Sequence, residues 1–142
     1  VNQAHLVIEV TEGTVLGEDS TAIGLLRSWR DMGIHTAIDD FGTGYSNFDS
    51  LERLNPEIIK ADMGYLAAAV QGDRRGMTVM RVTRALADSV DALVLAEGIA
   101  DEASLTTVRN LGIPLGQGFL LGRPMPLADL AEWRSSTPVP PA

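Results

Sequence analysis

The sequence predicts an α/β fold in which about five strand–helix units build a mostly parallel sheet. Five short runs rich in β-branched residues alternate with segments whose apolar residues recur at helical spacing. Parallel neighbours need a crossover connection, usually a helix, and the alternation supplies one after each strand. The chain has 142 residues, 45% hydrophobic and 21% charged, which is the composition of one folded domain with a single core.

The first unit joins a strand predicted at 6–10 to a helix that ends before Gly33, a residue suited to a helix C-cap. Apolar side chains recur in this helix at the i, i+3, i+4, i+7 spacing that gives one buried face. The predicted face consists of Ala22, Leu25, Leu26, Trp29 and Met32.

The second strand, predicted at 34–38, runs into Asp39-Asp40 and a glycine-rich loop, and a short helix follows near 47–54. Asn55-Pro56 closes that helix, because the residue before a proline is driven out of the helical conformation. The third strand ends in Lys60-Ala61-Asp62. After it we predict one long helical region, whose apolar positions include Val79, Val82, Leu86 and Val90.

The fourth strand, predicted at 93–96, ends at Glu97-Gly98. Asp101 is placed to cap the next helix. The fifth strand, near 113–115, meets Gly116-Gln117-Gly118, and a last short helix is predicted at 127–133. The apolar residues of the capped helix that should face inward are Leu105, Val108 and Leu111, before Gly112.

The two ends of the chain set the expected boundaries of the domain. Residues 135–142 are rich in proline and serine, so we expect a folded domain at 1–134 and a tail after it. The chain enters an apolar stretch directly from Val1, which is typical of an internal piece of a longer protein. No apolar run approaches the roughly 20 residues needed to span a bilayer, and the cytoplasm is the default location.

Charge and cysteine content exclude several classes of function. The formal charge of −8 argues against binding to a nucleic-acid polymer, which depends on lysine and arginine neutralising phosphates. The absence of cysteine excludes a disulfide scaffold and a thiolate metal site. An acidic chain still binds an anionic ligand where metal ions reverse the local charge.

The most informative feature is that every predicted strand carries or ends in a polar side chain. Because the carboxyl ends of parallel strands form one rim, these residues should converge. Several carboxylates on one rim repel one another unless a cation is bound, and oxygen ligands without cysteine favour Mg²⁺ or Mn²⁺. Two ions bridged by one Asp would suit phosphodiester hydrolysis. The residues are Glu9, Asp39, Asp40, Lys60, Asp62, Glu97 and Gln117.

Each of these residues also has a purely structural interpretation. Glu9 suits a salt bridge at a sheet edge, Asp39-Asp40 an Asx-type turn, and Lys60 a side chain that extends to water from a strand end. We expect His5 and His35 to be structural or exposed rather than metal ligands. The repetition of the same placement on five successive strands favours a site.

Two architectures are compatible with five strand–helix units. An open, doubly wound sheet, as in phosphoacceptor receiver domains, fits the length and also uses an acidic pair, a Lys and a divalent ion. Receivers place the acidic pair on the first strand and the Lys on the fifth, whereas here they lie on the second and third. The alternative is a partial (β/α)₈ barrel of the TIM type.

Five motifs, in order, resemble the EAL domain of cyclic di-GMP phosphodiesterases. The most specific is the loop Asp39-Asp40-Phe41-Gly42-Thr43-Gly44-Tyr45-Ser46, which is similar to the family's DDFGTGYS signature. The other motifs are Glu9-Val10-Thr11-Glu12, Ile59-Lys60-Ala61-Asp62, Ala96-Glu97-Gly98 and the segment 117–124, QGFLLGRP. The resemblance covers nearly the whole chain up to the tail and implies the partial barrel.

The resemblance also implies roles for individual residues. Glu9 and Asp39 would bind a first metal ion, and Asp39 and Asp40 a second, helped by Asp62. Lys60 would orient the attacking water and stabilise charge on the phosphate, and Glu97 would act as a general base or metal-site carboxylate. Gln117 would support the site through hydrogen bonds. Glu12 would brace the loop of Phe41, Gly42, Thr43 and Gly44, which in this family links the metal site to the dimer interface.

The implied reaction is metal-dependent hydrolysis of cyclic di-GMP to linear pGpG by a homodimeric parent protein. The chain departs from the family pattern, because it lacks the Glu-Ala-Leu motif and the metal-binding Asn of the next strand, and has Ala100 where the family has Glu. We therefore expect the chain alone to be inactive and, with two open sheet edges and an exposed apolar interior, to self-associate or aggregate. The alternative is a non-catalytic module that senses cyclic di-GMP or mediates protein interaction and dimerisation.

Overall fold

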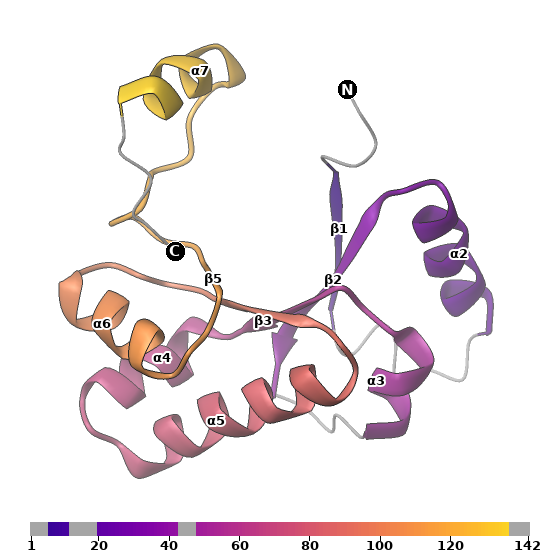
Figure 1. The fold of residues 1–142 in the computed structure, drawn as a ribbon, viewed down its shortest axis with the longest axis horizontal. Helices are drawn as coiled ribbons and strands as arrows, with labels where there is room; N and C mark the ends of the chain where they lie inside the picture. The colour runs from indigo at the N-terminus through magenta and orange to yellow at the C-terminus, as the bar shows by residue number, and fades with distance from the viewer. Residues whose placement is uncertain (1–5, 12–19, 43–47, 137–142) are drawn as a thin grey trace.

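The computed structural model describes residues 6–11, 20–42 and 48–136, which form a five-stranded parallel sheet and six helices (Figure 1). The strands are β1 (Val7–Thr11), β2 (His35–Phe41), β3 (Ile58–Ala61), β4 (Leu93–Ala96) and β5 (Leu115–Gly116). The helices are α2 (Ser20–Asp31), α3 (Phe48–Leu54), α4 (Met63–Val70), α5 (Arg74–Ser89), α6 (Glu102–Asn110) and α7 (Leu127–Ser136). The predicted α/β class and the order of five strands are confirmed, whereas β2 runs on to Phe41 and β5 begins only at Leu115.

The order of the strands decides between the two architectures. In the sheet the strands follow their order in the chain, β1-β2-β3-β4-β5, and every neighbouring pair is parallel. A doubly wound receiver-type sheet reverses direction at a switch point, which gives the order 2-1-3-4-5. Strands that add on one side only, each followed by a helix on the outside, are typical of a (β/α)₈ barrel.

The hydrophobic core lies between the sheet and the helices. Ile38, Ile59 and Val94 are paired in register across β2, β3 and β4, and at most 2% of each is exposed. Met80 of α5 and Leu66 of α4 belong to the same buried cluster. Full burial of such a side chain contributes about 1.5 to 3 kcal/mol each, so this layer provides much of the stability of the chain.

The opposite face of the sheet is open at the amino-terminal ends of the strands. Side chains alternate along a strand, so the face away from the helices includes Val7, Lys60 and Leu93. Val7 is 47% exposed and Leu93 is 50% exposed, both large values for apolar residues on a parallel sheet. The described residues therefore show the exposed apolar inner face, and the two edge strands β1 and β5, that five barrel strands were expected to leave.

The long helical region predicted after β3 is in fact two helices, α4 and α5. Gly72 breaks the region with a φ of +77°, and the side chain of Asp73 caps α5 by accepting a hydrogen bond from the Gly76 backbone N–H at 3.0 Å. A Cβ on Gly76 would lie 2.6 Å from the backbone N of Ala69, so this glycine lets the two helices pack closely. The prediction missed the Gly-Asp pair as a stop and start signal.

The buried faces of two helices also differ from those predicted. In α5, Val82 is 50% exposed, and the buried residues are Gly76, Met80, Thr83 and Ala87. In α2, Leu26 is buried, whereas Leu25 is about half exposed, as is Met32, which follows the helix. Apolar residue type at helical spacing therefore did not by itself identify which side chains are buried.

The ends of α2 and α6 lie where capping residues and glycines in the sequence predict them. Asp101 caps α6 in a reciprocal capping box with Ser104, and Gly33 and Gly112 end α2 and α6 with positive φ angles. Val108 of α6 is buried, and Leu105 and Leu111 are half-buried against the core. Helix α7 reaches Ser136, two residues into the segment expected as a tail, and Figure 1 shows it apart from the other helices.

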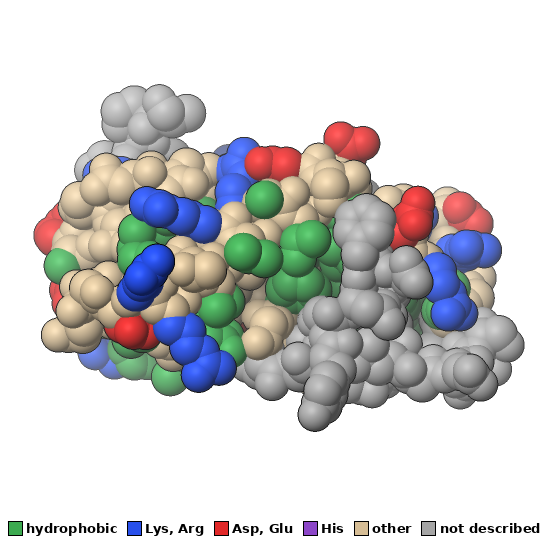
Figure 2. All heavy atoms as spheres, turned by 90° about the horizontal axis from the view of Figure 1, so that it is seen from below, with side chains coloured by type: hydrophobic (Ala, Val, Ile, Leu, Met, Phe, Trp, Pro, Cys, Tyr) green, Lys and Arg blue, Asp and Glu red, His purple; other side chains and the backbone are tan. Residues whose placement is uncertain are grey.

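Basic residues are concentrated on the helical side of the molecule. Figure 2 views the molecule from below Figure 1 and shows several basic side chains on the half where α5 begins. Five of the 11 basic residues lie on α5 and α6, namely Arg74, Arg75, Arg81, Arg84 and Arg109.

In the part of the chain that the structure describes, no helix combines the length and apolarity needed to cross a membrane.

Candidate metal centre

Four strands bring one lysine and three carboxylates together at their carboxyl ends. The Nζ atom of Lys60, near the end of β3, lies 2.8 Å from Glu9 Oε2 on β1 and 2.8 Å from Asp39 Oδ1 on β2. It also lies 2.9 Å from Oε1 of Glu97, which follows β4. The predicted convergence of these four residues is thus present in the structure.

Lys60 is at the centre of this cluster and is largely hidden from solvent. Its side chain is 5% exposed, and its three N–H donors match the three carboxylate acceptors. Burial alone would lower the pKa of Lys60, but the hydrogen bonds to Asp39, Glu9 and Glu97 outweigh it and raise the pKa above its usual value. The ammonium therefore stays charged throughout the physiological pH range.

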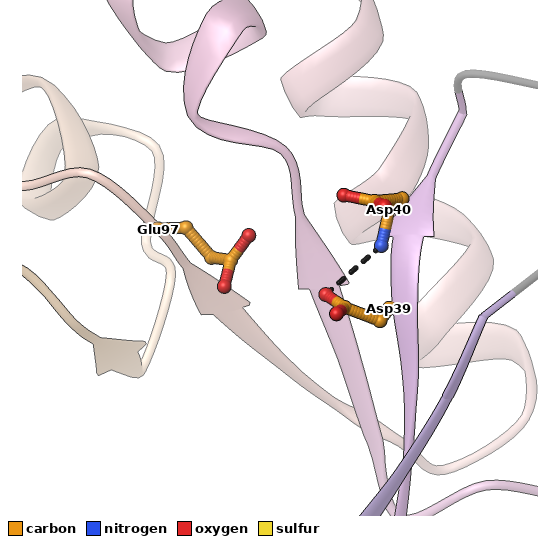
Figure 3. A group of neighbouring side chains, drawn as sticks. All are labelled: Asp39, Asp40 and Glu97. Carbon is orange, nitrogen blue, oxygen red and sulfur yellow. Dashed lines mark hydrogen bonds between the residues drawn. The ribbon is translucent and has the colours of Figure 1, made fainter.

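The end of β2 turns sharply at Asp40, which has a φ of +56°. Asp is among the few residues that tolerate this left-handed conformation. The Asp40 backbone N–H donates to Asp39 Oδ1 at 3.0 Å, which orients the Asp39 carboxylate against the turn. In Figure 3, Asp39 and Asp40 extend from β2 and Glu97 from beyond β4, on opposite sides of β3.

Asp39, Asp40 and Glu97 form a group that fits a hard divalent ion. Each offers a carboxylate oxygen, and these oxygens all lie within 4.8 Å of one another. Oxygen-only donors suit Mg²⁺, Mn²⁺ or Ca²⁺. Glu9 is outside this group of three, contacts the Lys60 ammonium and is 46% exposed, so it remains accessible.

Asp62 caps the helix that follows β3. Its side chain accepts a hydrogen bond from the Gly64 backbone N–H at 2.9 Å and caps α4. It does not belong to the group formed by Asp39, Asp40 and Glu97.

Backbone hydrogen bonds fix the loops that carry Glu97 and Gln117. The Glu97 N–H donates to the Ala61 carbonyl at 3.2 Å, and the Gln117 N–H donates to the Ala96 carbonyl at 2.9 Å. The Ile99 N–H in turn donates to the Gln117 carbonyl at 3.0 Å. The backbone of Gln117 thus bonds to the residues on both sides of the Glu97–Gly98 pair.

The glycine-rich loop after Asp40 is described only at its start. Phe41 is buried in the core, and the Gly42 carbonyl accepts a hydrogen bond from the Tyr65 hydroxyl at 2.8 Å. Glu12, Thr43 and Gly44 lie outside the described residues. Sequence reasoning missed Tyr65, whose only signal was an aromatic residue in the first turn of an alanine-rich helix.

A cavity of about 510 Å³ lies beside this rim, between the segment after β5 and α7. Its lining includes Gln117, Phe119, Arg123 and Trp133. The Arg123 guanidinium stacks over the Phe119 ring, 4.4 Å from its centroid, and Phe119 is 61% exposed. An exposed aromatic ring beside a cation is suited to a flat, anionic ligand such as a nucleotide.

Comparison with known proteins identifies the family of this chain. The family profile of the EAL domain matches residues 1–124. The bifunctional diguanylate cyclase/cyclic di-GMP phosphodiesterase MucR of Pseudomonas aeruginosa is 36% identical over 127 residues, which cover 89% of this chain and 18% of MucR. The chain thus spans less than a fifth of that relative.

Two solved structures show the same arrangement of strands and helices. The MucR phosphodiesterase in complex with cyclic di-GMP superposes with a TM-score of 0.84 at 35% identity, over 92% of this chain and 52% of that one. Klebsiella pneumoniae BlrP1 with manganese and cyclic di-GMP gives a TM-score of 0.77 at 29% identity, over 87% and 31% of the two chains. The sheet is therefore part of a TIM-type barrel, and the chain belongs to the EAL domain family.

Proposed function

We propose that this chain is the carboxyl-terminal part of a domain that hydrolyses cyclic di-GMP to linear pGpG. The observation that carries the proposal is the cluster in which Lys60 joins Glu9, Asp39 and Glu97 at one rim of the sheet. The relatives named for cyclic di-GMP hydrolysis, and the solved complexes with this nucleotide, support the choice of substrate. The cytoplasm, where nucleotides are made, is the proposed location.

Two divalent ions, Mg²⁺ or Mn²⁺, would be held by Glu9, Asp39, Asp40 and Asp62. Bound ions of this kind activate water and neutralise charge on phosphate oxygens. The manganese in the BlrP1 complex supports a divalent ion at this rim. The Phe119–Arg123 cavity would accept one guanine base, which places the phosphate toward the carboxylates.

Lys60 and Glu97 would carry out the proton and charge chemistry. Glu97 accepts a proton from the attacking water, whose oxygen forms a bond to phosphorus. The bond from phosphorus to the ribose 3′-oxygen breaks on the opposite side, and that oxygen leaves with a proton to give the linear product. The Lys60 ammonium orients the water and stabilises the negative charge that builds up on the phosphate oxygens.

The test compares the 142-residue chain with a polypeptide extended upstream of Val1, because the Glu-Ala-Leu motif is absent from this sequence. With Mg²⁺, chromatography should show pGpG from the extended protein and none from the chain alone. Glu97→Gln should slow the extended protein about 100-fold or more, and Glu52→Gln, an exposed acid on α3, should not. Magnesium-dependent turnover by the 142-residue chain would refute the expected inactivity.

A second candidate is a non-catalytic module that senses cyclic di-GMP or mediates protein interaction. Ala100, which stands where the family has Glu, favours it. Calorimetry of the extended protein with cyclic di-GMP and Ca²⁺ separates the two, because tight binding without hydrolysis in Mg²⁺ supports the sensor. The proposed homodimer is tested in the same protein by light scattering.

A further inference from the structure

The cation that the carboxylate cluster already contains is Lys60. This residue is the only lysine in the sequence. Its Nζ lies within 2.9 Å of Glu9, Asp39 and Glu97, three of the residues to which the proposed function assigns roles at the metal site.

The contacts with Glu9, Asp39 and Glu97 occupy all the hydrogen-bond donors of the Lys60 ammonium. Lysine has three N–H donors, and each faces one carboxylate oxygen. Asp39 Oδ1 also accepts the Asp40 backbone N–H at 3.0 Å, so this oxygen is already shared by two donors. A divalent ion that binds these carboxylates has to share them with the lysine or displace it.

The backbone positions that carry the carboxylates are set by the strands and loops around them. The Glu97 N–H donates to the Ala61 carbonyl at 3.2 Å, and Asp39 lies on β2 in register with Thr11 of β1. Removing the lysine therefore leaves three carboxylates on the same rim without their positive charge, which strengthens their attraction for a divalent ion. With a lysine side chain only 5% exposed, solvent and salt screen this charge weakly.

We propose that Lys60 is the resident counter-ion of the metal centre and competes with divalent ions for Asp39, Glu9 and Glu97. The competition weakens metal binding and keeps the cluster intact when metal is scarce. Metal binding then frees the ammonium from at least one carboxylate, so that it can turn toward the phosphate. This inference rests on the metal site of the proposed function and adds an order of events to it.

The first test is calorimetric titration of Mn²⁺ into the 142-residue chain and three variants. Lys60→Met removes the charge and should bind Mn²⁺ about tenfold more tightly, or better. Lys60→Arg keeps a cation and should stay within about threefold of the original chain. Arg109→Met removes the same charge from an exposed position on α6 and should change nothing, which controls for net charge.

The second test observes the lysine directly. Selective ¹⁵N labelling of lysine gives a single side-chain ammonium signal, because there is one lysine. Titration with diamagnetic Mg²⁺ should shift this signal with the same midpoint as the heat of binding. The measurement needs no variant, so it decides the question even where Lys60→Met fails to fold, as checked by circular dichroism.

The outcomes separate this inference from the proposed function. Equal or weaker Mn²⁺ binding by folded Lys60→Met, or an ammonium signal that does not move while Mg²⁺ saturates, overturns the competition and leaves the metal site in place. Absence of any metal binding in the chain and all variants overturns the competition, and absence of metal binding in the extended protein overturns the proposed function as well. Tighter binding by Lys60→Met with an inactive extended protein supports the competition and refutes only the hydrolysis.

Discussion

Replacing Gly118 with alanine puts a methyl group against the backbone of Ile99. A Cβ at this position would overlap the Ile99 backbone N and O, and would lie 2.6 Å from its carbonyl carbon. Ile99 is fully buried, and its N–H and carbonyl bond Gln117 and Leu120 at 3.0 and 3.1 Å. Relieving the overlap stretches or breaks both bonds, and each buried group left unpaired costs about 1 to 3 kcal/mol.

We therefore expect Gly118→Ala to lower the free energy of unfolding by about 2 to 4 kcal/mol, which corresponds to roughly 5 to 15 °C in melting temperature. Urea denaturation and thermal melting followed by circular dichroism measure both quantities. Gly118 follows Gln117 after β5, and Ile99 lies in the loop after β4 that carries Glu97, so the variant should also bind Mn²⁺ more weakly than the original chain.

Gly24→Ala is the matched control. Gly24 lies in the middle of α2, and no atom lies within 4 Å of the position that an added methyl group would take, so the same substitution meets open space. Alanine is a better helix former than glycine, and the control should gain about 0.5 to 1 kcal/mol. A Gly118→Ala protein whose stability lies within about 0.5 kcal/mol of the original would show that the two loops do not depend on this close approach.

Three further predictions follow from single contacts. Asp101→Ala should lower the melting temperature at neutral pH, because the Ser104 backbone and hydroxyl hold the pKa of Asp101 below its ordinary value of 3.8. This stabilisation exists above that value and is lost as the pH falls through the lowered pKa, so melting curves of the two proteins should converge in strong acid. Tyr65→Phe should cost about 1 kcal/mol in urea denaturation, since it removes the hydrogen bond to the Gly42 carbonyl, and an unchanged midpoint would contradict that. Phe119→Ala in the extended protein should weaken cyclic di-GMP binding about tenfold by calorimetry, whereas Phe119→Trp should retain it; equal affinity of all three proteins would exclude stacking on this ring.

The positions of most strands, and the polar residues at their carboxyl ends, could be predicted from the sequence because they depend on local patterns of apolar and polar residues. The strand at 93–96 was predicted at its observed bounds, and the turn residues after β2 and β4 were placed correctly. Convergence of Glu9, Asp39, Lys60 and Glu97 followed from the general geometry of parallel strands. The resemblance to EAL domains then selected the barrel, which strand order supports independently.

Features that depend on tertiary contacts could not be predicted from local sequence patterns. Val82 and Leu25 fit an apolar stripe, yet small residues such as Gly76 determine which side of a helix packs closely. The cap made by Asp62 and the anchor made by Tyr65 depend on how α4 meets the end of β3. The left-handed conformation of Asp40 is likewise set by the turn around it, because its residue type only permits it.

The sequential order of the strands has a consequence for how such a domain assembles and grows. Among the described residues, each strand pairs only with the strands before and after it in the chain, so the sheet has the connectivity of a repeat array. In such an array, a nucleus can form at any adjacent pair and spread outward, and a unit can be added at either edge without rearranging those inside. The residues that bind and react are each delivered by a different unit, so the number of neighbouring units present determines how complete the chemistry at the rim is.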